Sequence, residues 1–476
     1  MNTTTSSTPR VPSTAGLLGQ VLRPGDDGYD EARAVWNGAI DRRPGFIVRC
    51  RSSAEVASAV RFAAANGLLL AVKGGGHSIP GWSVCEGGLM IDLSPMKAVH
   101  VDVERRIATA EPGLLLREYD AATQAHGLAS PGGEISHTGL AGLTLGGGIG
   151  WLSRKYGLAC DNLLEAEVVL ADGRIVVANE RQHADLFWAL RGGGGNFGVV
   201  TKFTFRLHPV PAMYAGFVMY PAAQAPAVLA HYERLTREAP DELSLVAALV
   251  NAPPAPFVPA ELQLQPVVAL AAVWVGSAEQ GERALQAVRR FGDPAVDTFG
   301  VQPYTGIQQW FDAGVPHGLH YYCRSEWLQP LEAADLQALA EAAARRTSPM
   351  SQVLVRHMAG AVRRVDPEAT AFRFRDVRHI LTVAATWTPG DARAEDHKQW
   401  CRDTWSALRP ASAGGGYVNH LTEEGASRTR EAYGAATWER LVAVKRKYDP
   451  TNLFRMNQNI DPGAADTQPP AGRLAT

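Results

Sequence analysis

Short apolar runs and helical patterns alternate in the first part of the chain. The run GFIVRC (45–50) is followed by residues 53–67, whose apolar positions repeat at i, i+3 and i+4, and then by LLLAVKGGGH (68–77). The first and third segments have the composition of strands, and the middle one predicts a helix with Ser53 as its N-cap. Strand, helix and strand in this order predict an α/β unit, and residues 98–208 predict a second one.

A different pattern begins near residue 210. The stretches LQLQPVVALAAVWVG (262–276) and RHILTVAATW (378–387) are apolar runs typical of strands in an antiparallel sheet. The stretch LEAADLQALAEAAARR (331–346) has the spacing of an amphipathic helix. We therefore expect an α+β fold, with helices flanking an antiparallel sheet in the middle of the chain.

These changes of pattern divide the chain into two folded units, since 476 residues are too many for one hydrophobic core. We expect residues 25–209 and 410–462 to form one unit that contains two α/β subdomains. Residues 210–409 are expected to form the other unit. Residues 1–24, which lack the apolar core of a secretory signal, and residues 463–476 are expected to be loose tails.

The composition narrows the range of partners and compartments. The formal net charge is -2, and no basic run is long enough to follow a nucleic-acid backbone. No stretch approaches the roughly 18 apolar residues of a membrane span. The five cysteines are odd in number and lack a CxxC pair, which indicates free thiols in a reducing compartment. We expect a cytoplasmic protein that binds neither nucleic acid nor membrane, with its oligomeric state left open.

Glycine is concentrated in four clusters. They lie within residues 74–76, 132–142, 146–150 and 192–198. Glycine lets backbone N–H groups approach an anion closely, so the four clusters together favour a groove for a phosphate-bearing cofactor over four unrelated turns. The glycines of the segment GGGNFG (193–198) can be aligned with a dinucleotide-binding fingerprint, but the flanking elements do not match it. The segment follows a helical pattern and precedes a strand. A Rossmann site needs the reverse order, so a nicotinamide enzyme is not favoured.

Five motifs in a fixed order resemble a known family. They are VKGGGHSIPG with GGLMIDLS, the segment that begins SHTGLAGLTLGGGIG, DLFWALRGGGGNFGVVT, YVNHLTEEG and YDPTNLFRMNQNI. The chain resembles the berberine-bridge-enzyme branch of the FAD-linked oxidases, which have the PCMH-type FAD-binding fold of the vanillyl-alcohol oxidase superfamily. The resemblance extends from Gly25 to Pro462 and is weakest between residues 209 and 409, where these families build their substrate pocket.

The resemblance implies a covalently bound FAD. In such proteins the histidine after the first glycine cluster bonds to the 8α-methyl carbon of the flavin, which makes His77 the implied anchor. A neutral imidazole is a competent nucleophile near neutral pH, and the attached nitrogen is expected to raise the flavin potential. The other residues implied to bind FAD are Gly74, Gly75, Gly76, Ser78, Ser136, His137, Gly139, Gly142, Gly146, Gly147, Gly198, Val199, Asn457 and Asn459.

A second covalent link, through a cysteine, occurs in many members of the family but is not expected here. Their cysteine lies in a Gly-x-Cys-Pro-Thr-x-Gly stretch, and the matching residues 133–139 have Ile135 at that position. Cys160 follows the glycine run and is assigned to packing. The resemblance therefore implies a single link, at His77.

Oxidation requires a group that takes a proton while hydride leaves the substrate carbon. Members of the family often use a polar residue of a Y-x-N-Y segment, which corresponds here to residues 417–420 with His420 in the place of the second tyrosine. In a strand, Tyr417 and His420 would point to opposite faces, so we expect a twist or bulge that brings both to the site as catalytic residues. An equal alternative makes His420 a supporting residue that is bonded to the flavin or to Asn457.

The resemblance implies an FAD-dependent oxidase that transfers hydride from an alcohol, hemiacetal or amine carbon to flavin N5, with dioxygen as the acceptor and hydrogen peroxide as the product. A dehydrogenase with another electron acceptor and a non-catalytic flavin-binding protein are the alternatives. No His, Asp or Glu cluster has metal-ligand spacing, and no GxSxG elbow occurs. The substrate is expected to be a small molecule, and sugars, nicotine-like amines and polyketide or alkaloid intermediates all remain open.

Overall fold

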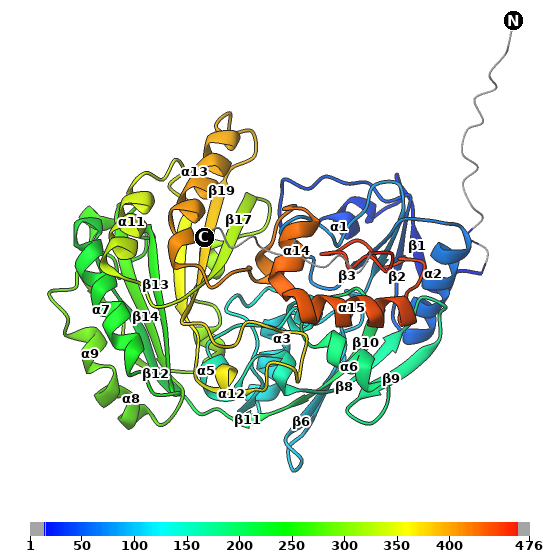
Figure 1. Ribbon diagram of the computed structural model, residues 1–476, viewed down its shortest axis with the longest axis horizontal. Coiled ribbons are helices and arrows are strands. Elements are labelled where there is room, and N and C mark those ends of the chain that lie inside the picture. The colour runs from blue at the N-terminus through cyan, green and yellow to red at the C-terminus, as the bar shows by residue number, and fades with distance from the viewer. Residues whose placement is uncertain (1–13, 15, 465–476) are drawn as a thin grey trace, which may run out of the picture.

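In the computed structural model, which describes residues 14 and 16–464, the chain folds into two adjoining lobes (Figure 1). The middle of the chain forms a lobe around a large antiparallel sheet. The other lobe combines the first and last segments, because helices α14 (Ala426–Tyr433) and α15 (Ala435–Tyr448) lie beside the N-terminal strands. The α+β fold class is confirmed.

The first glycine cluster follows a strand of a small sheet, in which β1 is antiparallel to β2 and the other pairs are parallel. The order of its strands is β1 (Gln20–Leu22), β2 (Phe46–Arg49), β4 (Leu89–Asp92) and β3 (Leu70–Lys73). Helix α2 (Ser53–Ala65) joins β2 to β3, as predicted. Its N-cap is Ser52, whose hydroxyl accepts the Glu55 amide, and the predicted cap Ser53 instead donates to Glu167.

The prediction of a loose tail over residues 1–24 is wrong for the part that the structure describes. Residues 20–22 form β1, which pairs with β2 and buries Leu22. A three-residue strand is too short to produce an alternating pattern, and it exists only because β2 offers an unpaired edge. Most of the two predicted tails, residues 1–13, 15 and 465–476, lies outside the described residues.

A second sheet of the same lobe is antiparallel throughout, and β7 (Leu128–Ala129) pairs with β11 (His208–Pro209) beside it. Its strands, in order, are β5 (Val99–Asp102), β6 (Ile107–Ala110), β10 (Val199–Arg206), β8 (Leu163–Val169) and β9 (Ile175–Asn179). The short helices of this lobe are α1 (Tyr29–Arg33), α3 (Leu116–Gln124), α4 (Leu140–Leu145), α5 (Ser153–Tyr156) and α6 (Ala184–Leu190). Phe203 of β10 and Leu441 of α15 belong to one buried cluster, so the last segment shares the core of the first.

The sheet of the middle lobe is antiparallel, as predicted. Its strands, in order, are β15 (Val296–Asp297), β12 (Met213–Pro221), β14 (Pro266–Trp274), β13 (Leu243–Asn251), β18 (Gln352–His357), β19 (His379–Trp387) and β17 (His320–Leu328), with β16 (Gly300–Gln302) also on β12. The helices of this lobe are α7 (Ala225–Arg237), α8 (Ala278–Ala284), α9 (Gln286–Arg289), α10 (Tyr304–Ile307), α11 (Ala333–Ala344), α12 (Ala361–Arg364) and α13 (Ala394–Ala407). Apolar residues of α7, α11 and α13 pack on one face of the sheet, which leaves the opposite face of β17 to β19 toward the other lobe.

A buried lysine fastens the last segment to the fourth glycine cluster. The Lys445 ammonium of α15 is fully buried and donates to the backbone oxygens of Asn196 and Phe454 and to the carboxylate of Asp449. Asp449 in turn accepts the backbone N–H groups of Leu453 and Phe454. Burial lowers the pKa of Lys445, but Asp449 opposes this effect and keeps the charged form paired.

Replacing Lys445 with methionine is expected to lower the free energy of unfolding by about 3 to 5 kcal/mol, because the Asp449 carboxylate would remain buried without its counterion. Urea unfolding followed by tryptophan fluorescence measures the change. Lys447→Met is the matched control, since its pair with Asp185 is largely exposed and should contribute less than about 1 kcal/mol. Equal losses in both variants would contradict the assignment.

All five cysteines are unpaired and buried, in agreement with the expectation of free thiols. None of the helices within residues 14 and 16–464 combines the length and the apolar composition that a bilayer crossing requires.

Candidate active site

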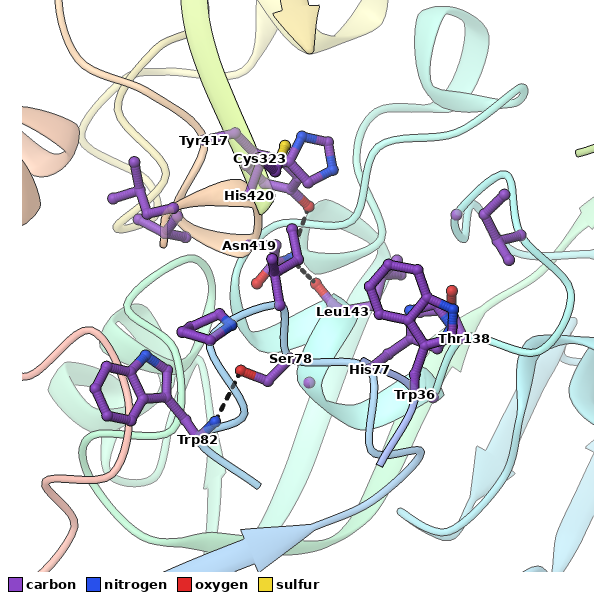
Figure 2. A pocket seen from close by; sticks show the side chains of 18 of the residues that line it. Trp36, His77, Ser78, Trp82, Thr138, Leu143, Cys323, Tyr417, Asn419 and His420 are labelled. Atoms are coloured by element: carbon purple, nitrogen blue, oxygen red, sulfur yellow. Dashed lines mark hydrogen bonds between the residues drawn. The ribbon is translucent and has the colours of Figure 1, made fainter. Parts of the chain in front are cut away.

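A cavity of about 370 Å³ lies where the two lobes meet, and its volume is in the range of small-molecule and cofactor sites. Segments far apart in the sequence line it, as Figure 2 shows. They are the loop after β3, the glycine-rich segment 133–149, residues 194–196, strands β17 to β19, residues 417–421 and residues 456–458.

Glycine backbone forms part of the cavity wall. Gly75 and Gly139 touch so closely that a Cβ on Gly75 would lie 2.4 Å from the Cα of Gly139. Gly76 has a φ of 68°, a left-handed conformation that favours glycine. A Cβ on Gly142 or Gly195 would meet nothing within 4 Å, so a side chain there would extend into open space beside the cavity. This wall allows a large planar or phosphate-bearing group to approach the backbone.

Several buried polar atoms around the cavity have no hydrogen-bond partner among residues 14 and 16–464. They include the indole N–H of Trp82, the hydroxyl of Ser83 and the amide oxygen of Asn457. Unsatisfied buried polar groups are costly, so such a set is typical of a site whose partners are supplied by a ligand. Donors, an acceptor and exposed glycine backbone fit the ribityl, phosphate and ring-edge groups of FAD.

His77 reaches the cavity at the end of the first glycine cluster. Its ring stacks on Trp36, with 4.5 Å between centroids, and Trp36 stacks on Tyr321 of β17 at 3.7 Å. Its Nε2 lies 2.8 Å from Nδ1 of His137. Burial, and then the charges of the two neighbouring histidines, hold the pKa of His77 well below 6.5. The ring is therefore neutral at pH 7, with a lone pair on one nitrogen.

The exposed face of the middle sheet forms the opposite wall. Cavity-lining residues alternate along two of the strands, as the two-residue period of a strand requires. They are Gln352, Leu354 and Arg356 of β18, and Ile380, Thr382 and Ala384 of β19. On β17, three consecutive residues, Tyr321, Tyr322 and Cys323, line the cavity. Leu354 pairs with Thr382 across the β18–β19 ladder, which places their side chains on the same face. This wall combines apolar side chains with Gln352, Arg356 and Thr382, which are spread along β18 and β19.

Residues 417–420 bring Tyr417 and His420 together, but not through a strand. Val418–His420 form a 3₁₀ turn, and the two rings lie with centroids 4.9 Å apart at the cavity (Figure 2). The expected strand with a twist or bulge is therefore wrong, and the turn places both side chains in the cavity lining. A turn of three residues places positions 417 and 420 on one side, which a strand does not.

The hydroxyl of Tyr417 is fixed by two hydrogen bonds at the edge of the cavity. That oxygen accepts the backbone N–H of Gly148, at 2.9 Å, and the side-chain amide of Asn419, at 2.8 Å. Burial raises the pKa of Tyr417. The same Asn419 donates to Leu143, so this group joins the turn to the glycine-rich segment.

His420 is linked to a charged pair through one hydroxyl. Arg356 is ion-paired with Glu134 and donates to Thr382 Oγ1, which lies 3.3 Å from His420 Nδ1. Burial, and then the Arg356 charge, lower the pKa of His420 to about 3. The imidazole is therefore neutral over the ordinary pH range, and its Nε2 is the nitrogen not engaged with Thr382.

The structure brings many of the residues implied by the resemblance to this cavity. Those that line it are Gly74, Gly75, Gly76, His77, Ser78, Gly139, Gly142, Tyr417, His420 and Asn457. Those outside its lining are Ser136, His137, Gly146, Gly147, Gly198, Val199 and Asn459. Ser136 donates to Asp312, and a Cβ on Gly198 would meet β8, so these two positions serve packing between segments.

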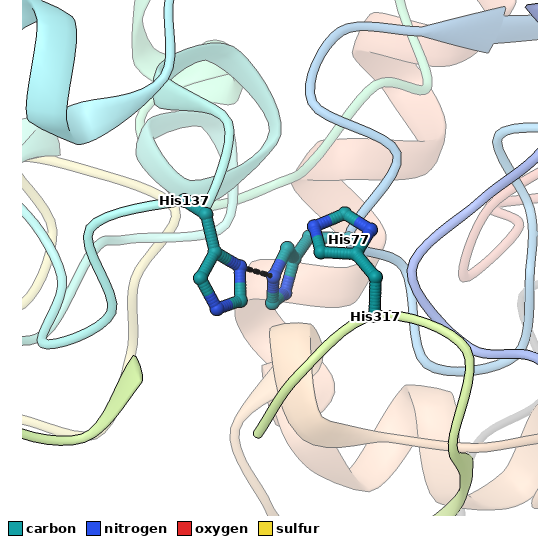
Figure 3. Close-up of side chains that lie close together, drawn as sticks. All are labelled: His77, His137 and His317. Carbon is teal, nitrogen blue, oxygen red and sulfur yellow. Dashed lines mark hydrogen bonds between the residues drawn. The ribbon is translucent and has the colours of Figure 1, made fainter. Parts of the chain in front are cut away.

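Sequence reasoning missed part of the site. Trp36, Trp82, Glu134 and Arg356 all line the cavity, and none carried a motif that separated it from ordinary core or surface residues. Sequence spacing also gave no sign that three histidines would meet. His77, His137 and His317 offer nitrogens within 4.8 Å of one another, a group of the size that a metal ion requires (Figure 3).

Comparison with known proteins agrees with this geometry. Residues 44–179 match the family described as FAD binding domain, and residues 416–461 match the family described as berberine and berberine like. An FAD-linked oxidoreductase of Dictyostelium discoideum is 34% identical over 451 residues, which cover 94% of this chain and 95% of that protein.

A second curated protein and a solved structure support the same assignment. The (R)-6-hydroxynicotine oxidase of Paenarthrobacter nicotinovorans is 32% identical over 461 residues, which cover 94% of this chain and 97% of that protein. The crystal structure of 6-hydroxy-D-nicotine oxidase from Arthrobacter nicotinovorans has a TM-score of 0.86 at 30% identity and covers 95% of this chain and 100% of its own. The chain is therefore an enzyme of the berberine-bridge-enzyme-like family of FAD-linked oxidoreductases.

Proposed function

We propose that this chain is an oxidase with one covalent FAD at His77, which removes hydride from an alcohol, hemiacetal or amine carbon and passes the electrons to dioxygen. The observation that carries the proposal is that His77 and His420 border the same glycine-walled cavity from distant segments. One is a neutral nucleophile suited to attachment, and the other is a neutral base suited to accept a proton.

FAD supplies the hydride acceptor when it is bound. The backbone of Gly74 to Gly76, with Gly139 and Gly142, would hold it, and Trp82 and Asn457 would satisfy its polar groups. A single link agrees with the side chains present. Ile135 lines the cavity where a second, cysteine link would form, and Cys160 is fully buried with its pKa raised by that burial.

His420 is the proposed base. For Nε2 to accept a proton from a substrate hydroxyl or amine, Nδ1 must carry the proton of the neutral ring and donate it to Thr382 Oγ1. That oxygen has two lone pairs, so it accepts from Arg356 as well. Tyr417 acts as a positioning residue, because its hydroxyl fixes the turn that carries His420.

In this proposal one lobe binds the cofactor and the other contacts the substrate. Residues 25–209 and 410–462 form the flavin-binding unit, and residues 210–409 supply the substrate wall of β17 to β19. The wall, which places Arg356, Thr382 and Gln352 among apolar side chains, suits a small organic substrate that carries polar groups. Unpaired, buried thiols favour a reducing compartment such as the cytoplasm.

Reoxidation of the reduced protein tests the oxidase assignment without knowledge of the substrate. Photoreduced enzyme mixed with air-saturated buffer in a stopped-flow instrument is expected to recover its oxidised flavin spectrum within seconds, with one hydrogen peroxide formed per flavin. A flavin that stays reduced for minutes in air but is oxidised at once by an artificial quinone would identify a dehydrogenase instead. The same peroxide assay, run with sugars, nicotine-like amines and alcohols, identifies the substrate class.

A further inference from the structure

The contact between His77 and His137 has no role in the proposed reaction. His77 Nε2 and His137 Nδ1 are 2.8 Å apart, and Figure 3 shows the two rings edge to edge with His317 beside them. Within residues 14 and 16–464, this is the hydrogen bond that the structure records for the His77 ring. It occupies Nε2 and leaves Nδ1 as the nitrogen available for a bond to another group.

A metal site does not account for this contact. Two imidazole nitrogens bound tetrahedrally to one ion, each at about 2.0 to 2.1 Å, lie about 3.3 Å apart. The separation of 2.8 Å between Nε2 and Nδ1 is instead that of a hydrogen bond, in which one ring donates and the other accepts. The direction of donation is therefore the property that matters.

We propose that His137 is the positioning residue for flavin attachment. Its Nδ1 accepts a hydrogen bond from the Nε2–H of His77, which keeps the lone pair of His77 on Nδ1 of that ring. As the new bond forms, His137 takes the Nε2 proton of His77. The inference rests on the proposed covalent link at His77. If His137 donated instead, His77 would carry its proton on Nδ1, and that nitrogen would have no lone pair for attack.

The step balances in atoms and electrons. A bond forms between Nδ1 of His77 and the flavin methyl carbon, and a C–H bond of that methyl group breaks. The C–H bonding electrons reduce the flavin by two electrons, and two protons are released, one from the methyl carbon and one from Nε2 of His77. Dioxygen then takes the two electrons and two protons and becomes hydrogen peroxide. After attachment Nε2 has only a lone pair, so the hydrogen bond reverses and His137 donates to His77.

The surroundings of His137 suit a residue that receives a proton for a short time. Its side chain is 7% exposed, and burial lowers its pKa while the nearby Asp312 carboxylate acts in the opposite direction. Asp312 is itself fixed by the backbone N–H and the hydroxyl of Ser136, the residue before His137. The neutral ring of His137 can therefore accept the hydrogen bond from His77. When the ring becomes cationic, the nearby Asp312 carboxylate stabilises its charge.

Attachment kinetics of two variants test the inference. The full-length chain is produced in a riboflavin-starved host and incubated with FAD, and acid-stable flavin is measured over time by intact mass. His137→Leu removes the acceptor and is expected to slow attachment by about 100-fold or more, with FAD still bound non-covalently.

His137→Asn places an amide oxygen near the position of Nδ1 and is expected to attach flavin faster than the Leu variant. His317→Ala is the control and is expected to match the wild type, because His317 is exposed and 6.1 Å from the His77 ring centroid.

The outcomes separate this inference from the function on which it rests. Attachment at the wild-type rate in His137→Leu, or an Asn variant no faster than the Leu variant, would overturn the role of His137 and leave the covalent link intact. Wild-type protein that binds FAD but never forms acid-stable flavin would overturn the link and the inference together. Thermal melting of each variant with FAD bound shows that slow attachment does not reflect misfolding.

Discussion

Protein with His77 replaced by alanine is expected to contain no acid-stable flavin. The neutral imidazole that borders the cavity would be gone, and burial raises the pKa of Cys323, the thiol in the cavity lining, which disfavours the thiolate. Residual FAD would be bound only by glycine backbone and polar groups, and the flavin potential would fall because the electron-withdrawing nitrogen is missing. We expect substrate-driven flavin reduction to slow by about tenfold, a barrier increase of about 1.4 kcal/mol.

Acid precipitation followed by peptide mapping measures this result. In the wild type, the flavin-bearing peptide is expected to contain His77. His100→Ala, which alters an exposed histidine of β5, is the control and should retain full covalent flavin. Acid-stable flavin in His77→Ala that maps to Cys160 or to any other residue would contradict the assignment.

Replacing His420 with alanine is expected to lower kcat/KM by about 10² to 10⁴-fold, the usual contribution of a general base. Covalent flavin should be unchanged, because His420 enters the cavity from residues 417–421 and not from the loop of His77. A variant that keeps more than a third of the wild-type activity would show that another group accepts the proton. His320→Ala, at the start of β17, is the histidine control, since it lies outside the cavity lining.

The pH profile gives an independent measure of the same group. The proposed base works in its neutral form, so activity is present above its pKa and is lost as the pH falls through that value. Because burial and Arg356 lower the pKa of His420 to about 3, kcat/KM should show no loss between pH 8 and pH 5 from this residue. An acid limb centred near the ordinary histidine value of about 6.5 would assign the limiting protonation to a different group.

The larger elements of the fold could be predicted because their patterns extend over many residues. Strands β14 and β19 and helix α11 were all expected from apolar runs or helical spacing, and the structure contains each of them. The errors occur where an element is short. Strand β1 depends on the free edge of β2, and the turn at Val418–His420 depends on Asn419 and Tyr417 contacting a glycine-rich segment more than 260 residues earlier.

The sequence predicts the first glycine cluster and His77 as one part of the cavity lining, but it does not predict the wall that the middle sheet forms. Gly74 to Gly76 and His77 are adjacent in sequence, so one motif carries them to the cavity as a unit. Arg356 and Thr382 come from two strands whose pairing fixes their relation, and single residues on apolar strands carry no signal of that pairing. The contact between His77 and His137 could not be predicted for the same reason. The two residues are 60 positions apart, and only the folded chain brings them together.

Because the cavity is lined by residues from Trp36 to Gln458, it can be complete only after nearly the whole described chain has folded. A ribosome-bound chain that has emerged only through the middle sheet has the loop of His77 but lacks the turn at 417–420 and Asn457. It also lacks Lys445, which ties the last segment to Asn196. The cavity wall of such a chain is therefore incomplete, and binding of the cofactor is expected to wait until residues 417–458 have folded against the earlier segments.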